Sequence, residues 1–129
     1  MAAQTDLWGD IIQAEVRTPV AILREQASLL GIKTKNLIEA SVKTSVKGGE
    51  FRHSFRLVVP ALDGYTYELF EIFHGVSIYP ITVPNRVGNL EAPGLRLKDE
   101  EAFLNWLGHQ LSSNETKRII SNLLAQATT

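Results

Sequence analysis

The sequence contains no cysteine, and this absence excludes three kinds of chemistry at once. Without thiols the chain has no disulfide framework, no thiolate zinc site and no cysteine nucleophile. Nothing in it calls for an oxidising compartment, so the cytoplasm is the expected location.

Long apolar runs are also missing. No stretch approaches the ~18 residues that a membrane span needs, and the first residues lack the basic region of a secretory signal. The sequence therefore predicts neither a membrane anchor nor a membrane partner.

Neither sign of charge is in large excess, because the sequence contains 13 Lys and Arg and 14 Asp and Glu, for a net charge of −1. A near-neutral chain is not attracted as a whole to a polyanion, so nucleic acid is not an expected partner. A length of 129 residues with 44% hydrophobic residues is typical of a single globular domain, residues 1–129.

The common catalytic patterns are absent as well. There is no Gly-x-Ser-x-Gly elbow and no Gly-rich phosphate loop, and the three histidines do not stand at zinc-site spacing. We expect no metal, no cofactor and no catalytic residues.

What is present begins with helical signals. Leu7, Trp8, Ile11 and Ile12 have helical spacing and predict a short helix over 6–15, which Gly9 weakens. A stronger helix is predicted over 19–30. It starts at Thr18, a good N-cap, and at a proline suited to the first helical position.

Two strands follow, over about 37–47 and 51–59. Their apolar residues alternate with polar ones, and Gly48-Gly49 between them indicates a tight turn. Pairing Lys47 with Glu50 brings the two apolar rows onto one face, which predicts an antiparallel hairpin with a fixed register. The predicted pairs are Val46 with Phe51, Thr44 with His53, Val42 with Phe55, and Ala40 with Leu57.

The rest of the chain predicts strands over about 65–73 and 76–83, a loop over 84–94, a short fifth strand at 95–97, and helices over about 99–111 and 113–126. The expected fold class is α+β. An antiparallel meander of four to five strands carries the N-terminal helix and the two C-terminal helices on one face.

Aromatic residues occur on both faces of the third and fourth strands. Alternation assigns Tyr67, Leu69 and Phe73 to the main core and leaves an opposite apolar face that needs cover. We expect this second face to contact the N-terminal segment, another protein or, preferably, a second copy in a homodimer. Its residues are Phe70, Ile72, Tyr79 and Ile81.

A polar pocket is a further candidate site. If Val59 pairs with Tyr65, His53 faces Glu71 on the third strand, with Tyr67 nearby. A carboxylate beside an imidazole can act as an acid–base pair, or as half of a metal site. The interpretation we prefer is a hydrogen-bonded pair that only stabilises the sheet, since buried polar groups are normally paired.

The outward face of the first hairpin carries a basic patch of Lys43, Lys47, Arg52 and Arg56. It can bind an acidic partner or a nucleic-acid backbone, but solvated charges that protect a strand edge are the favoured explanation. Aromatic residues that would stack on single-stranded bases are missing from this face.

Several motifs, in a shared order, resemble an uncharacterised group of small free-standing bacterial α+β proteins. They are Pro19 to Ala27, Phe55 to Leu62 leading into Asp63 to Phe70, His74 with Tyr79-Pro80, and Glu115 to Gln126. The resemblance implies a bacterial domain with this order of elements and brings no known activity.

Together these observations favour a non-catalytic protein-interaction or regulatory domain of a bacterium, one that neutralises or scaffolds an unknown partner protein. The alternative is a small enzyme or small-molecule-binding domain with a pocket around His53, Glu71 and Tyr67. An interaction domain should show an exposed apolar surface, whereas an enzyme needs polar groups that converge in a concavity.

Overall fold

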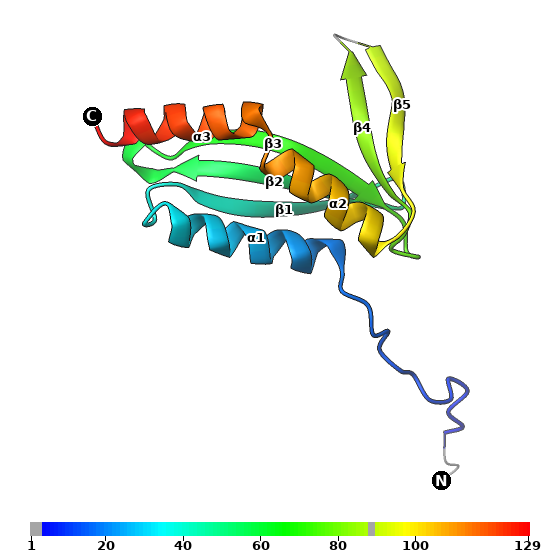
Figure 1. Cartoon of the computed structure of the whole chain (residues 1–129). Coiled ribbons are helices and arrows are strands. Elements are labelled where there is room, and N and C mark those ends of the chain that lie inside the picture. The colour runs from blue at the N-terminus through cyan, green and yellow to red at the C-terminus, as the bar shows by residue number, and fades with distance from the viewer. Residues whose placement is uncertain (1–3, 88–89) are drawn as a thin grey trace.

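The fold is known from a computed structural model, which describes residues 4–87 and 90–129, with side chains outside 86–93. It contains α1 (Pro19–Lys33), β1 (Glu39–Lys47), β2 (Glu50–Val59), a 3₁₀ turn η1 (Pro60–Leu62), β3 (Tyr65–His74), β4 (Ile81–Val87), β5 (Leu90–Leu97), α2 (Glu100–Leu111) and α3 (Asn114–Ala127). The five strands form one antiparallel sheet in the order β1-β2-β3-β4-β5. The predicted α+β meander is therefore confirmed (Figure 1).

Residues 4–17, which we call the arm, extend from the start of α1 away from the rest of the chain (Figure 1). They contain no helix, so the short helix expected over 6–15 is wrong for this structure. Gly9 has a φ of 67°, a conformation that a helix does not contain. The predicted start of α1 is confirmed, because the Thr18 hydroxyl accepts a hydrogen bond from the Ala21 amide and Pro19 takes the first helical position.

The first hairpin has the predicted register. Val46 lies opposite Phe51, Thr44 opposite His53, Val42 opposite Phe55, and Ala40 opposite Leu57. Two glycines with positive φ form the turn, a conformation that residues with a Cβ rarely adopt. The two-glycine turn and the alternation of apolar residues predict the same register, which is why the pairing could be predicted from the sequence.

Strand β3 contains a β-bulge that alternation alone did not reveal. The pairing with β2 starts as predicted, with Val59 opposite Tyr65, but it shifts between Phe55 and Arg56, so that Leu69 is one residue more than β2 can pair. Leu69 and Phe70 therefore both point towards the helices, and both pack on the core. Beyond the bulge the two faces of β3 are exchanged relative to the prediction.

The predicted boundaries around the fourth strand are also wrong. Residues 75–80 form the connection, β4 begins at Ile81, and most of the expected loop over 84–94 belongs to a β4–β5 hairpin. Among the described residues, two pairs join this hairpin to β3: Phe73 with Thr82 and His74 with Ile81. The hairpin diverges from the other strands beyond its base (Figure 1).

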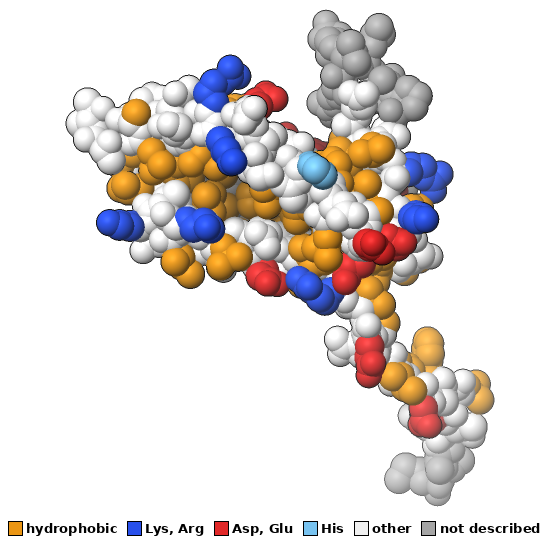
Figure 2. Space-filling model, viewed as in Figure 1, with side chains coloured by type: hydrophobic (Ala, Val, Ile, Leu, Met, Phe, Trp, Pro, Cys, Tyr) orange, Lys and Arg blue, Asp and Glu red, His pale blue; other side chains and the backbone are white. Residues whose placement is uncertain are grey.

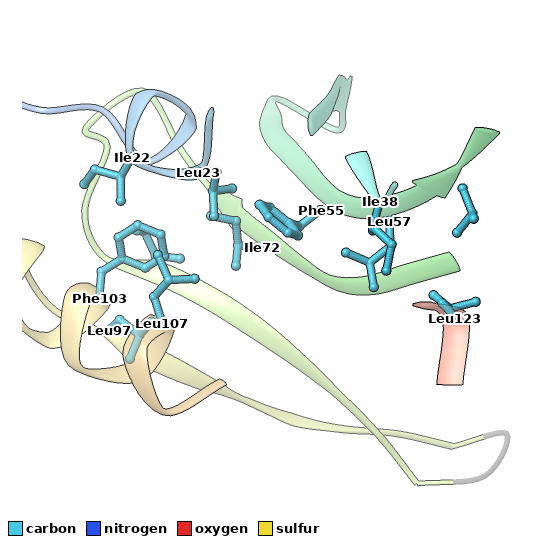
Figure 3. Packing of buried hydrophobic residues seen from close by; sticks show 12 residues of the cluster. Ile22, Leu23, Ile38, Phe55, Leu57, Ile72, Leu97, Phe103, Leu107 and Leu123 are labelled. Carbon is cyan, nitrogen blue, oxygen red and sulfur yellow. The ribbon is translucent and has the colours of Figure 1, made fainter. Parts of the chain in front are cut away.

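The three helices lie on one face of the sheet, and the core lies between the two layers (Figures 1 and 3). Phe103 and Leu107 of α2 pack with Ile22 and Leu23 of α1 in a single cluster with the sheet. The side chains of the cluster are Ile22, Leu23, Ile38, Phe55, Leu57, Val59, Ile72, Ile81, Leu97, Phe103, Leu107 and Leu123.

Candidate functional site

An apolar groove separates the second half of α1 from the junction of α2 and α3. It has a volume of about 440 Å³, within the range of ligand and peptide sites. Figure 2 shows hydrophobic side chains in this hollow, with Lys and Arg side chains beside it. The residues that line the groove are Gln26, Leu29, Leu30, Lys33, Phe55, Leu57, Leu69, Gly108, Leu111, Ser112, Thr116, Lys117 and Ile120.

The β3 bulge helps to build the floor of the groove. Since Leu69 and Phe70 point to the same side, Leu69 contributes to the floor while Phe70 stacks on Phe55 at 5.2 Å between ring centroids. Phe70 also meets the Trp106 ring of α2 edge to face, at 5.1 Å. The bulge thus supplies one residue for the groove and another that anchors α2.

A set of hydrogen bonds fixes the end of the groove where α2 turns into α3. The Ser113 hydroxyl accepts from the Thr116 amide at 3.2 Å, as expected of an N-cap. The buried Thr116 hydroxyl donates to the Gln110 carbonyl at 2.8 Å, which ties the start of α3 to the end of α2. These contacts join α2 and α3 at this end of the groove, where Ser112 and Thr116 line it.

The exposed amines of Lys33 and Lys117 stand on opposite sides of the groove. Among the described side chains, those of residues 4–85 and 94–129, neither lysine takes part in an ion pair. An apolar floor between two positive rims fits a segment that is apolar on one side and acidic on the other.

Four large apolar side chains of the arm are among the most exposed apolar side chains of the described residues. Leu7 is 89% exposed, Trp8 82% and Ile12 85%, and Ile11 is exposed to a similar degree. Each forgoes roughly 1.5–3 kcal/mol of burial in water, and such a cluster is unusual on a free monomer. The sequence pointed to these residues by their helical spacing, but as cover for the sheet.

The predicted polar pocket does not form. His53 lies opposite Ile72, and the bulge moves Glu71 to the position opposite Ser54, on the other face of the sheet. Tyr67 precedes the bulge and packs on the helix side, so Glu71 is separated from both of its expected partners. The prediction that His53 faces Glu71 is wrong because it assumed an uninterrupted register.

His53 instead belongs to a hydrogen-bonded chain that the sequence did not reveal. Its Nε2 is 2.8 Å from Nε2 of His74, and its Nδ1 is 2.9 Å from the Thr44 hydroxyl. Nδ1 of His74 donates to the Gly75 carbonyl at 2.9 Å. The bulge makes His74 a diagonal neighbour of His53, because it places Ile72 opposite His53.

This geometry fits a neutral pair of imidazoles. Because the Gly75 carbonyl only accepts, a neutral His74 has its proton on Nδ1 and accepts at Nε2, so His53 donates from Nε2 and accepts from Thr44. Burial, then the His74 ring and the Arg24 guanidinium, lower the pKa of His53 from 6.5 to about 4. The groove is not lined by either histidine, so these contacts serve the structure of the sheet.

The predicted interaction surface is wrong as well. Ile72 and Ile81 have no exposed area, and Phe70 and Tyr79 pack against the same core, so this chain alone covers all four. The bulge turned Phe70 and Ile72 towards the helices. Burial also raises the pKa of Tyr79, whose hydroxyl makes no hydrogen bond to the described residues.

The predicted basic patch lies on the outer face of the sheet, as expected, but two acidic residues interrupt it. Arg52 pairs with Glu71 at 3.4 Å and stacks over the Phe73 ring at 4.2 Å. Arg56 donates to the Ser54 hydroxyl, which in turn donates to Glu68. Lys43 and Lys47 line the same shallow hollow. Glu71 therefore balances the charge of Arg52, whereas Arg56 is linked to Glu68 only through the Ser54 hydroxyl.

We predict that this outer face does not bind nucleic acid. The protein should show no salt-sensitive binding to a random single-stranded oligonucleotide at physiological ionic strength at concentrations up to about 10⁻⁴ M, the weak end of non-specific affinities. Fluorescence anisotropy measures this directly. Binding that weakens as salt is added, and that Arg52→Ala with Arg56→Ala abolishes, would contradict the prediction.

Comparisons with known proteins were made by family, by sequence and by fold. No family model matches the chain, and neither the curated proteins nor the solved structures contain a significant match. In the described part of the chain, no group of three or more His, Asp or Glu side chains is arranged to hold a metal ion. No helix there combines the length and apolar character required to span a membrane.

Proposed function

We propose that the chain is a non-catalytic protein-interaction domain of a bacterium, acting in the cytoplasm, and that the groove between α1 and the α2–α3 junction receives a segment of its partner. The observation that carries the proposal is the apolar floor of the groove, which lies open between two lysines. Docking of an amphipathic helix in such a groove is a common mode of recognition between proteins.

The nature of the groove supports binding over catalysis. Its floor consists of the apolar side chains Phe55, Leu57 and Leu69, with few polar groups that converge on one point. An active site needs a nucleophile, an acid or a base within reach of a bound substrate. Holding a partner segment also provides a simple way to neutralise or scaffold that partner, as the sequence led us to expect.

A photocrosslinking amino acid placed at Leu29 tests the proposal in cells that naturally contain the protein. Leu29 is on the wall of the groove and is partly exposed, so the change does not disturb the core. We expect one discrete crosslinked protein from position 29, which is lost when Ile120→Asp places a charge in the groove.

The matched control is the same amino acid at Val76, which is exposed and lies outside the groove. Position 76 should give no such product. Failure to crosslink from position 29, or equal products from 29 and 76, would contradict the proposed function.

A further inference from the structure

The groove has a candidate occupant within this chain. We propose that the arm of a second copy docks in the groove, with Leu7, Trp8, Ile11 and Ile12 facing its floor, so that two chains exchange arms in a homodimer. This inference rests on the proposed function, because it names the segment that the groove receives.

The first argument is the apolar pattern of the arm. Positions 7, 8, 11 and 12 are one and four residues apart, so a helical arm presents all four on one face. In the free chain they extend into solvent as non-helical backbone, visible as the hydrophobic side chains of the projecting segment in Figure 2. Such a segment gains its helix when its apolar face is covered.

The second argument is charge. The arm contains Asp6, Asp10 and Glu15 and one basic residue, Arg17 at its end, so the rest of this chain of net charge −1 is net positive. In a helical arm Asp10 lies one turn beyond Asp6 on the flank next to Leu7, and Glu15 lies one turn beyond Ile11, at the end of the apolar face. Asp10 and Glu15 are therefore the acidic residues nearest to the rims of the groove, whereas Asp6 lies opposite the apolar face. The rims carry Lys33 and Lys117, which complement that charge.

The third argument is size. Five helical steps separate Leu7 from Ile12, which is about 8 Å along a helix axis, and seven steps of α1 between Gln26 and Lys33 give the wall about 10 Å. The four apolar side chains of the arm therefore match the length over which the groove is open.

The direction of the arm favours a second copy over its own groove. Thr18 is extended, as a residue before proline normally is, and the arm points away from the body (Figure 1). Contacts of Ile22 and Leu23 with Phe103 and Leu107 close the space between α1 and α2 nearest to the arm. Two chains related by a twofold axis can each fill the other's groove without this obstruction.

Sedimentation velocity over a range of concentrations tests the exchange. We expect the wild type to dimerise, and Ile12→Asp in the arm or Leu29→Asp in the groove to raise the dimer dissociation constant by roughly tenfold to a hundredfold. Both positions are exposed in the monomer, so the variants should fold. Val76→Asp, an equivalent change at an exposed site outside arm and groove, should dimerise like the wild type.

Mixing the two defective variants tests whether the contact is between chains. The groove of Ile12→Asp and the arm of Leu29→Asp are unaltered, so one intact arm–groove contact can form between the two variants. The mixture should therefore associate more strongly than either variant alone. A wild type that stays monomeric at high concentration, or a mixture that associates no better than its components, would overturn the exchange.

The fluorescence emission of Trp8 distinguishes an arm in the groove of a second copy from an arm in its own groove. The variant Trp8→Phe gives the signal of Trp106 alone. A blue shift that grows with concentration is the expected result. A blue shift in a strictly monomeric protein would place the arm in its own groove and overturn the second copy. If position 29 also crosslinks to a different protein in that case, the proposed function stands while this inference fails.

Discussion

Replacing Phe55 by alanine is expected to lower the free energy of unfolding by about 3–5 kcal/mol, the cost of removing a buried aromatic ring. Phe55 is 2% exposed and stacks on Phe70, which in turn supports Trp106 of α2. The cavity left by the ring stays largely unfilled, because neither the sheet nor the helices can move far enough to close it. Chemical denaturation at neutral pH measures the change.

Tyr65→Ala provides the matched control for this substitution. It removes a ring of similar size from the same sheet, but Tyr65 is 48% exposed. Its cost should be clearly smaller than that of Phe55→Ala. Equal costs for the two variants would show that the Phe55 ring is not in the core.

Acidification should destabilise the protein through His53. The pKa of His53 is lowered to about 4 in the folded state, against 6.5 for the ordinary group, so between these values the unfolded chain binds more protons than the folded one. The contribution of His53 to the free energy of unfolding is therefore complete above pH 6.5 and is lost as the pH falls towards 4. Its full size is about 3 kcal/mol, from the relation between pKa shift and free energy.

The hydrogen bonds of His53 also predict a loss of stability at low pH. A second proton on His53 makes both of its ring nitrogens donors, so Nδ1 can no longer accept from the Thr44 hydroxyl. Arg24, on the helix packed above, adds a further positive charge. Protonation of His53 therefore removes the hydrogen bond that Thr44 donates to it.

Urea denaturation at several pH values between 7 and 4 measures this loss. Carboxylates titrate in part of the same range, so the comparison is with His53→Gln, which removes the imidazole and should flatten the curve between pH 6.5 and 4. His109→Gln changes an exposed histidine and should retain the wild-type slope. Identical slopes for the wild type and His53→Gln would contradict the assignment.

Local signals in the sequence predicted the first half of the sheet well. The register of β1 and β2 follows from Gly48-Gly49 and from two apolar rows that coincide on one face. The caps at Thr18 and Asp99 likewise fixed the starts of α1 and α2, because each side chain accepts from an amide three residues later. In each case nearby residues carry all of the information.

The errors have two physical causes. Both faces of β3 carry apolar residues, so the sequence pattern is compatible with a strand whether or not a bulge is present. For this reason the extra residue Leu69 could not be recognised from the sequence. In β4, Pro84 suggested a loop, yet it lies where the pairing with β5 is irregular and no regular ladder amide is required. The groove depends on how far α1 and α3 stand apart over the sheet, which no local pattern records.

The bulge in β3 has a consequence for the evolution of the chain length. Leu69 is the extra residue, and its neighbour Phe70 already points to the same side. Deletion of codon 69 would therefore leave every later residue of the strand on its present face, while the groove would lose part of its floor. Insertions and deletions inside strands normally reverse the faces of the residues that follow, but a deletion at this position keeps those faces and changes only the floor of the groove.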